Sequence, residues 1–258
     1  MSANSSGMLE ISFIPAFRDN YIWLLVRGER AAVVDPGDAE PVAEHLRRRG
    51  LVLEAILVTH HHGDHQGGVE ALAARWHPTV FGPAAESITG CNRPLCGGER
   101  ITVLDEGFDV LAVPGHTLGH LAYVMAGAAF VGDTLFGAGC GRLFEGTPAQ
   151  MAASLRRLTE LPAATRVYCA HEYTAANLEF AAAVEPANGA IARRRARVAV
   201  LRAQGAATVP LDLAEERETN PFLRCACPDV VRAAQACQPD ACDPVAVFAA
   251  IREWKNTF

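Results

Sequence analysis

Four metal-binding side chains follow one another closely in the segment Thr59–His65, which reads Thr-His-His-His-Gly-Asp-His. The segment comes directly after Ala55–Val58, a short apolar stretch that predicts a buried strand. A strand that ends in a tight turn, here followed by Gly67-Gly68, can direct several imidazoles and a carboxylate at one point. The spacing therefore predicts a metal site, and the candidate ligands are His60, His62, Asp64 and His65.

Three more candidate ligands each stand just past a predicted strand: His116, Asp133 and His171. Five histidines and two aspartates are too many for one catalytic zinc, which takes three protein ligands and a water. They suit two metal ions about 3.5–4 Å apart with a bridging carboxylate. We expect one ion to be held by His60, His62 and His116, the other by Asp64, His65 and His171, and Asp133 to bridge them.

Such a pair of cations lowers the pKa of a shared water toward about 7, the value for zinc-bound water. A hydroxide nucleophile is then present at neutral pH without a catalytic serine or cysteine. We therefore expect hydrolysis of a carbonyl or phosphoryl ester, with Asp64 and Asp133 as catalytic as well as ligating residues. A closed structural zinc site is the alternative, but it would normally be rich in cysteine.

Three further titratable residues, His61, His120 and Asp35, are not counted among the ligands. His61 is the in-between residue of its run, so we expect its side chain to point away from the metals. His120 either orients a ligand by hydrogen bonding or has no role at the site. Asp35 lies just after an early strand and is a candidate supporting residue, although turn chemistry explains it equally well.

Composition bounds the class of protein. The 258 residues are 50% hydrophobic, enough for one large domain or one domain with a small second. A net charge of −6 argues against general nucleic-acid binding. No apolar stretch is long enough to span a membrane, and residues 1–7 lack the features of a signal peptide. We expect a cytoplasmic protein with reduced cysteines, and a monomer, although the sequence does not decide the oligomeric state.

The first two-thirds of the chain alternate strand-like and helix-like segments, whereas the remainder is helical in pattern with no strand signal. The predicted division is an α/β catalytic domain over residues 8–174 and a helical, substrate-binding domain over residues 175–258. Strands are expected at 9–14, 21–26, 31–34, 55–58, 108–113, 121–125, 129–131 and 166–169. Helices are expected at 39–49, 68–75, 148–158, 175–184, 190–203, 228–236 and 244–254.

The ligand run, with Gly-His-Thr at 115–117 and Gly-Asp-Thr at 132–134, resembles the metallo-β-lactamase superfamily. That resemblance implies an αβ/βα sandwich with two metals at one edge, here followed by a small all-helical C-terminal domain.

A closer resemblance, over nearly the whole chain, is to the glyoxalase II family of hydroxyacylglutathione hydrolases. It implies cleavage of S-D-lactoylglutathione to D-lactate and glutathione. The segments that carry it are Ile14–Phe17, Asp19–Tyr21, Cys140–Thr147, Val167–Thr174, Val184–Pro186 with Asn188, Leu213–Arg224 and Arg252–Phe258.

The resemblance also implies substrate contacts. Arg142, Arg252 and Lys255 match residues that meet the carboxylates of glutathione, and Tyr173 matches a substrate-contacting tyrosine. Phe144 stands where many members carry tyrosine, so we expect it to make a packing contact only. The alternative is that Arg252 and Lys255 lie on a helix face exposed to solvent and have no contact with substrate. Ala170, in place of the usual glycine before the last ligand, is expected to shift that loop slightly.

A thioester suits this site because its thiol product has a pKa near 8.5 and leaves without strong acid help. The resemblance implies attack by the bridging hydroxide, with the ion of His60, His62 and His116 taking the oxyanion and the other ion stabilising the thiolate.

Other reactions on the same scaffold are the nearest alternatives: lactonase, β-lactamase or one-iron persulfide dioxygenase chemistry. A non-enzymatic metal-binding module is a third. The ligand set suits zinc best, with iron or manganese as alternatives. The spacing of Cys225, Cys227, Cys237 and Cys242 does not favour a second zinc site.

Overall fold

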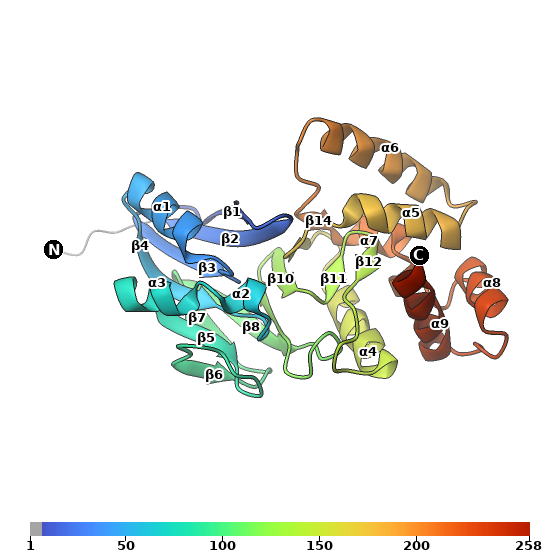
Figure 1. The fold of residues 1–258 in the computed structure, drawn as a ribbon, viewed down its shortest axis with the longest axis horizontal. Helices are drawn as coiled ribbons and strands as arrows, with labels where there is room; N and C mark the ends of the chain where they lie inside the picture. The colour runs from blue at the N-terminus through green and yellow to red at the C-terminus, as the bar shows by residue number, and fades with distance from the viewer. Residues whose placement is uncertain (1–6) are drawn as a thin grey trace. The chain divides into compact units, whose positions relative to one another are not determined.

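A computed structural model describes residues 7–258 of the protein (Figure 1). The expectation that residues 1–7 lack the features of a signal peptide falls mostly on residues 1–6, which lie outside that range. The described residues form two compact units. The first comprises residues 7–112, 119–126 and 130–132, and the second comprises residues 113–118, 127–129 and 133–258.

A six-stranded mixed sheet forms the larger part of the first unit (Figure 1). Its first three strands pair antiparallel, and the pairs from the third strand onward are parallel. In sheet order the strands are β1 (Glu10–Ala16), β2 (Asn20–Arg27), β3 (Arg30–Val34), β4 (Val52–Leu57), β5 (Thr79–Pro83) and β6 (Arg93–Leu95).

Two helices pack on this sheet and share one apolar core with it. The helix α1 (Ala39–Arg49) begins where Asp38 accepts a hydrogen bond from the Glu40 amide, and it ends at Gly50 in the left-handed conformation. The helix α3 covers Val69–Trp76. Both helices were predicted, because amphipathic spacing and end signals are local properties of the sequence.

The ligand run leaves the sheet at the end of β4 and enters a single helical turn, α2 (Gly63–Gln66). This turn lies against the segment after β3 so closely that glycine is required. A Cβ on Gly37 would lie 1.9 Å from the carbonyl oxygen of Asp64. The close approach brings Asp35 next to the ligand run.

A second group of strands in the first unit contains β7 (Arg100–Val103), β8 (Glu106–Ala112), β9 (Leu121–Met125) and β10 (Ala128–Gly132), in that order. Phe130–Gly132 of β10 belong to this unit. Hydrogen bonds join β9 to the segment after β4: the hydroxyl of Tyr123 donates to the Val58 carbonyl at 2.8 Å, and the Leu121 amide donates to the Thr59 carbonyl at 2.8 Å.

The second unit is mainly helical (Figure 1). Its helix α4 begins at the predicted Thr147 cap, which forms a capping box with Gln150. The helices are α4 (Pro148–Thr159), α5 (Thr174–Val184), α6 (Gly189–Ala203), α7 (Leu213–Thr219), the 3-10 turn η1 (Pro221–Leu223), α8 (Pro228–Cys237) and α9 (Pro244–Thr257). The strands are β11 (Leu135–Phe136), β12 (Gly139–Cys140), β13 (Arg166–Cys169) and β14 (Leu211–Asp212).

The expectation of no strand after residue 174 is wrong. Residues Leu211–Asp212 form β14, which pairs antiparallel with β13. A two-residue strand is too short for alternation of polar and apolar residues to reveal it. The strands β5, β6, β7, β11 and β12 were also missed, and β6, β11 and β12 have only two or three residues each. Among the described residues, no helix is both long and apolar enough to cross a membrane.

We predict that Tyr123→Phe destabilises the protein, because it leaves the buried Val58 carbonyl without the phenol donor. The loss should be about 1–2 kcal/mol in the free energy of unfolding. Urea unfolding followed by circular dichroism measures it. An unchanged midpoint would mean that the hydroxyl contributes nothing to the junction between β9 and the ligand run.

Candidate metal centre and substrate pocket

The histidines of the ligand run converge in the first unit. Nε2 of His60 lies 3.0 Å from Nδ1 of His62, and the ring of His65 lies 4.1 Å from that of His60, measured between centroids. His60 and His65 are fully buried. Imidazole nitrogens brought this close suit a shared cation, since two protonated rings would repel each other.

Asp35 fixes where the ring protons lie. Its carboxylate accepts hydrogen bonds from the amide and hydroxyl of Thr59, both at 2.7 Å, and from Nδ1 of His65 at 3.0 Å. Because the Thr59 hydroxyl donates to Asp35, it can accept from Nδ1 of His60, which lies 3.1 Å away. In the neutral rings of His60 and His65 the Nε2 atoms then carry no proton, as metal ligation requires. Of the two roles considered for Asp35, this geometry fits the supporting one.

Asp64 is held by a side chain from the start of β2. The Asn20 amide donates to Oδ2 of Asp64 at 3.0 Å. The same oxygen lies 3.6 Å from Nε2 of His65. Asp64 and His65 therefore present a carboxylate oxygen and a bare nitrogen side by side, which is the donor pair predicted for one ion.

His61 and His120 differ from these ligands in their surroundings. His61 binds Oε2 of Glu86 through its backbone amide at 2.7 Å and through Nδ1 at 3.0 Å, in keeping with the expected turn away from the ligands. The fully buried His120 stacks on His60, with ring centroids 4.7 Å apart. A Cβ on Gly132, whose φ is +48°, would lie 2.8 Å from the His120 ring, so glycine is required there.

The second unit contains the other three candidate ligands, arranged around Asp133. Its Oδ2 lies 3.4 Å from Nε2 of His116, and its Oδ1 lies 3.4 Å from Nε2 of His171. Nδ1 of His116 donates to the Arg142 carbonyl at 2.8 Å, which leaves its Nε2 bare in the neutral ring. One carboxylate that offers each of its oxygens to a different imidazole is the arrangement expected of a bridging ligand.

A pocket of about 390 Å³ opens beside Asp133 and His116, entirely within the second unit. It brings together all five side chains that were predicted to contact substrate: Arg142, Phe144, Tyr173, Arg252 and Lys255. Phe136, Cys140 and Asn177 also line it, although none of them was predicted to contact substrate. Phe136 and Asn177 come from a two-residue strand and a helix with no motif of their own, whereas Cys140 begins the family-like segment Cys140–Thr147.

Arg252 is only 6% exposed, so the solvated-face alternative is wrong for this residue. One guanidinium nitrogen donates to the Cys140 carbonyl at 3.0 Å, and another donates to the Asn256 side chain at 3.2 Å. The guanidinium also lies over the ring of Phe222, 5.2 Å from its centroid. These contacts orient Arg252 toward the pocket without neutralising its charge.

Lys255 is half-buried on the same face of α9, one turn further along. Burial lowers the pKa of its amine, and repulsion by Arg252 and then Arg142 lowers it further. Repulsion among the three cations shows that positive charge is concentrated at this pocket. An anionic group bound there would relieve it.

Aromatic rings cover the ligands of the second unit. The ring of Tyr173 stacks on that of His171, with centroids 4.8 Å apart. Phe144 meets the ring of His116 edge to face at 5.2 Å and is otherwise 62% exposed. Phe144 therefore offers the apolar packing surface that was expected of it.

The fold and the ligand arrangement define a class. The profile of the metallo-beta-lactamase superfamily matches residues 16–107 and 94–171. Among solved structures, ETHE1 from Myxococcus xanthus aligns with a TM-score of 0.66 at 24% identity, covering 97% of this chain and 99% of that one. The BLEG-1 B3 metallo-beta-lactamase aligns with a TM-score of 0.63 at 22% identity, covering 84% and 99%. The chain has the metallo-β-lactamase fold predicted from its motifs.

Closer relatives narrow this class to one family. The profile described as the hydroxyacylglutathione hydrolase C-terminus matches residues 172–258. A hydroxyacylglutathione hydrolase of Dechloromonas aromatica is 61% identical, over 97% of this chain and all of that protein. Another, of Methylobacillus flagellatus, is 54% identical over the same shares. The chain belongs to the hydroxyacylglutathione hydrolase family.

We predict that Asp35→Asn weakens metal binding by roughly 10- to 100-fold, because an amide offers one oxygen acceptor where three donors now converge. Competition with a chromogenic chelator measures the affinity. Asp38→Asn is the matched control: it removes the same charge three residues away, and asparagine caps a helix as well as aspartate does. Equal affinities in the two variants would contradict the role given to Asp35.

Proposed function

We propose that the protein hydrolyses S-D-lactoylglutathione and related 2-hydroxyacylglutathiones to the free hydroxy acid, such as D-lactate, and glutathione. One observation carries this proposal: a single pocket contains candidate metal ligands and three cationic side chains. Glutathione has two carboxylates and needs such cations from a protein whose net charge is −6. The names of the relatives at 61% and 54% identity agree with this reaction.

The site's donor set fits metal ions, and we propose two divalent ions, zinc in the first place, with iron or manganese as alternatives. One would be held by His60, His62 and His116, the other by Asp64, His65 and His171, and Asp133 would serve both. Supporting this, TTHA1623, 27% identical over 83% of this chain, is a protein with a di-iron-bound form. When bound, such ions lower the pKa of water and polarise a carbonyl group.

The remaining roles fall to the chain's own side chains. Arg142, Arg252 and Lys255 bind the carboxylates of glutathione and so fix the thioester relative to Asp133. Tyr173 and Phe144 pack against the substrate and exclude water from it. The departing thiol, with a pKa near 8.5, needs no side-chain acid to leave.

The alternative reactions on this scaffold, a lactonase or a persulfide dioxygenase, are not favoured. The likeness to ETHE1, at 24% identity, supports a shared fold and no shared reaction. The relatives named as hydrolases are more than twice as similar in sequence. Oxygen uptake with a glutathione persulfide, measured beside thioester cleavage, separates the two chemistries.

We also propose that the catalytic part covers residues 8–174 and that the helical part, residues 175–258, serves substrate binding. Arg252 and Lys255 on α9 support the second assignment. The eight cysteines of the described chain are all free, which suits a reducing, cytoplasmic location. A monomer that binds no nucleic acid or membrane completes the proposal.

We predict that chelation abolishes thioester cleavage and that Asp133→Ala lowers kcat by at least about 100-fold, on the scale of losing a transition-state interaction. Arg252→Ala should mainly raise KM, because it removes a binding charge from the substrate's remote end. Initial rates with S-D-lactoylglutathione, with metal content per chain measured in parallel, test both. An unchanged KM in Arg252→Ala would contradict its assignment to substrate.

The lowered pKa of the Lys255 amine predicts that the affinity for glutathione depends on pH. The charged amine binds the carboxylate, so affinity is full below its pKa and falls as the pH rises through it. Because that pKa is lowered in the fold, the decline should begin at a lower pH than for an ordinary lysine. Calorimetric titration with S-methylglutathione measures it. Lys255→Arg should remove the decline. Lys255→Met should bind weakly with no such decline and match the wild type only above the pKa of the lysine; a decline that persists in Lys255→Arg would contradict the assignment.

A further inference from the structure

The hairpin of β11 and β12 supplies one wall of the pocket but has little structure of its own. Each strand has two residues. Phe136 and Cys140 of this hairpin line the pocket, and Asp133 precedes it by two residues. At its tip, Ala138 adopts a φ of +52°, a left-handed conformation that is unfavourable for a residue with a Cβ atom. Such a conformation persists only where surrounding contacts hold it.

Several of those contacts come from two fully buried polar residues, Glu216 in the middle of α7 and Asn220 at its C-terminal cap. The Glu216 carboxylate accepts hydrogen bonds from the Ala138 amide at 2.8 Å and from the Asn220 side chain at 3.1 Å. The Asn220 amide group donates to the carbonyls of Phe136 at 3.2 Å and Gly139 at 2.9 Å. Together they bind the hairpin backbone at three residues, Phe136, Ala138 and Gly139, from about eighty residues away in sequence.

Arg194 on α6 makes a buried carboxylate possible at this place. Its guanidinium pairs with Glu216 and donates to the Thr219 hydroxyl at 2.6 Å, and its side chain is only 2% exposed. An unpaired charge buried this deeply would be strongly destabilising. The network is therefore complete: a paired charge, a satisfied amide and a fixed hairpin.

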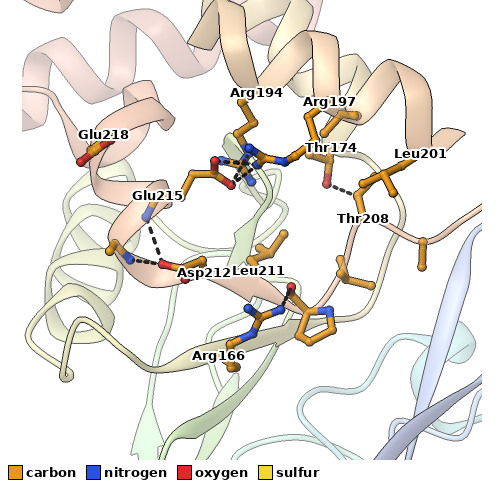
Figure 2. Close-up of a pocket in the computed structure, with 15 residues that line it drawn as sticks. Arg166, Thr174, Arg194, Arg197, Leu201, Thr208, Leu211, Asp212, Glu215 and Glu218 are labelled. Carbon is orange, nitrogen blue, oxygen red and sulfur yellow. Dashed lines mark hydrogen bonds and ion pairs between the residues drawn. The ribbon is translucent and has the colours of Figure 1, made fainter. Parts of the chain in front are cut away.

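A cavity of about 560 Å³ lies on this part of the second unit and is lined by Arg194, Arg197 and Glu215 among others (Figure 2). Glu215 pairs with both arginines, at 3.2 Å from Arg194 and 2.6 Å from Arg197. Arg166, on the opposite wall in the figure, donates to the Pro210 carbonyl at 2.8 Å. Since these cations already have partners, we propose no anion site in this cavity. Glu215 is instead the matched control for Glu216.

We propose that Glu216 and Asn220 are positioning residues for the glutathione pocket, acting through the β11–β12 hairpin. This rests on the proposed function of that pocket. The hairpin holds the Cys140 carbonyl where it accepts the hydrogen bond of Arg252, and it places Phe136 against the ring of Tyr173, with centroids 5.2 Å apart. Release of the hairpin therefore disturbs two substrate contacts together, and neither Glu216 nor Asn220 is itself a candidate metal ligand.

The test compares Glu216→Gln with Glu215→Gln in the metal-loaded, full-length protein. Both variants remove one carboxylate from the same helix and disturb an ion pair of Arg194, but only Glu216 contacts the hairpin. Three measurements follow: amide hydrogen exchange over residues 135–140, Kd for glutathione, and the separate changes in KM and kcat for S-D-lactoylglutathione.

Glu216→Gln should speed exchange over residues 135–140 and raise both Kd and KM by roughly 10- to 100-fold, with metal content unchanged and kcat lowered less than KM is raised. Glu215→Gln should leave all of these near wild type. Equal effects of the two variants, or unchanged exchange in the hairpin, would overturn the proposal.

Asn220→Ser provides a second route if Glu216→Gln fails to fold. Serine still offers an oxygen to the Phe222 amide, which Asn220 now caps, but it cannot reach the two hairpin carbonyls. It should reproduce the rise in Kd and KM, and its failure to do so overturns the proposal. The two proposals fail differently: a wild-type protein without thioesterase activity refutes the reaction, whereas full activity in Glu216→Gln and Asn220→Ser refutes the positioning role alone.

Discussion

The location of a few imidazole protons is the constraint on which the rest of the site depends. A neutral imidazole ligates a metal only through the nitrogen that has no proton. In the first unit, Asp35 draws the proton of His65 to Nδ1, and through Thr59 it does the same for His60. In the second unit, the Arg142 carbonyl fixes the proton of His116. Three nitrogens are thus prepared for a cation by groups that never touch it, and the close packing at Gly37 keeps Asp35 in reach.

A second constraint is electrostatic. The protein is acidic overall, yet Arg142, Arg252 and Lys255 gather at one pocket, where burial and then repulsion by the two arginines lower the pKa of the lysine. Such an arrangement is unfavourable in the free protein and is relieved by an anionic ligand. The aromatic rings of Phe222 and Phe180 lie 5.2 Å from Arg252 and Lys255 and stabilise the cations without cancelling them. The positive charge that we assign to substrate binding is therefore already concentrated beside Asp133 in the free protein.

The sequence permitted correct predictions wherever the signal was local. The helices α1 and α4 have end signals within a few residues of their first and last turns. The expected turn of His61 away from the ligands fits its contact with Glu86, because alternation along an extended segment is also local. The strand β14 was missed, since two residues show no periodicity, and the solvated-face alternative for Arg252 failed because burial depends on neighbours from distant segments.

By itself, the sequence supplied the candidate metal ligands through residue type, order and spacing, and the candidate substrate contacts through its resemblance to a family. The superfamily and the family followed from the same motifs. Only the tertiary structure decided that Asp35 directs the ring protons, that Arg252 is buried, and that Glu216 and Asn220 hold the hairpin at Ala138. The physical reason is separation along the chain. Each of these contacts joins residues that are far apart in the sequence, and such a contact produces no periodic pattern from which it could be predicted.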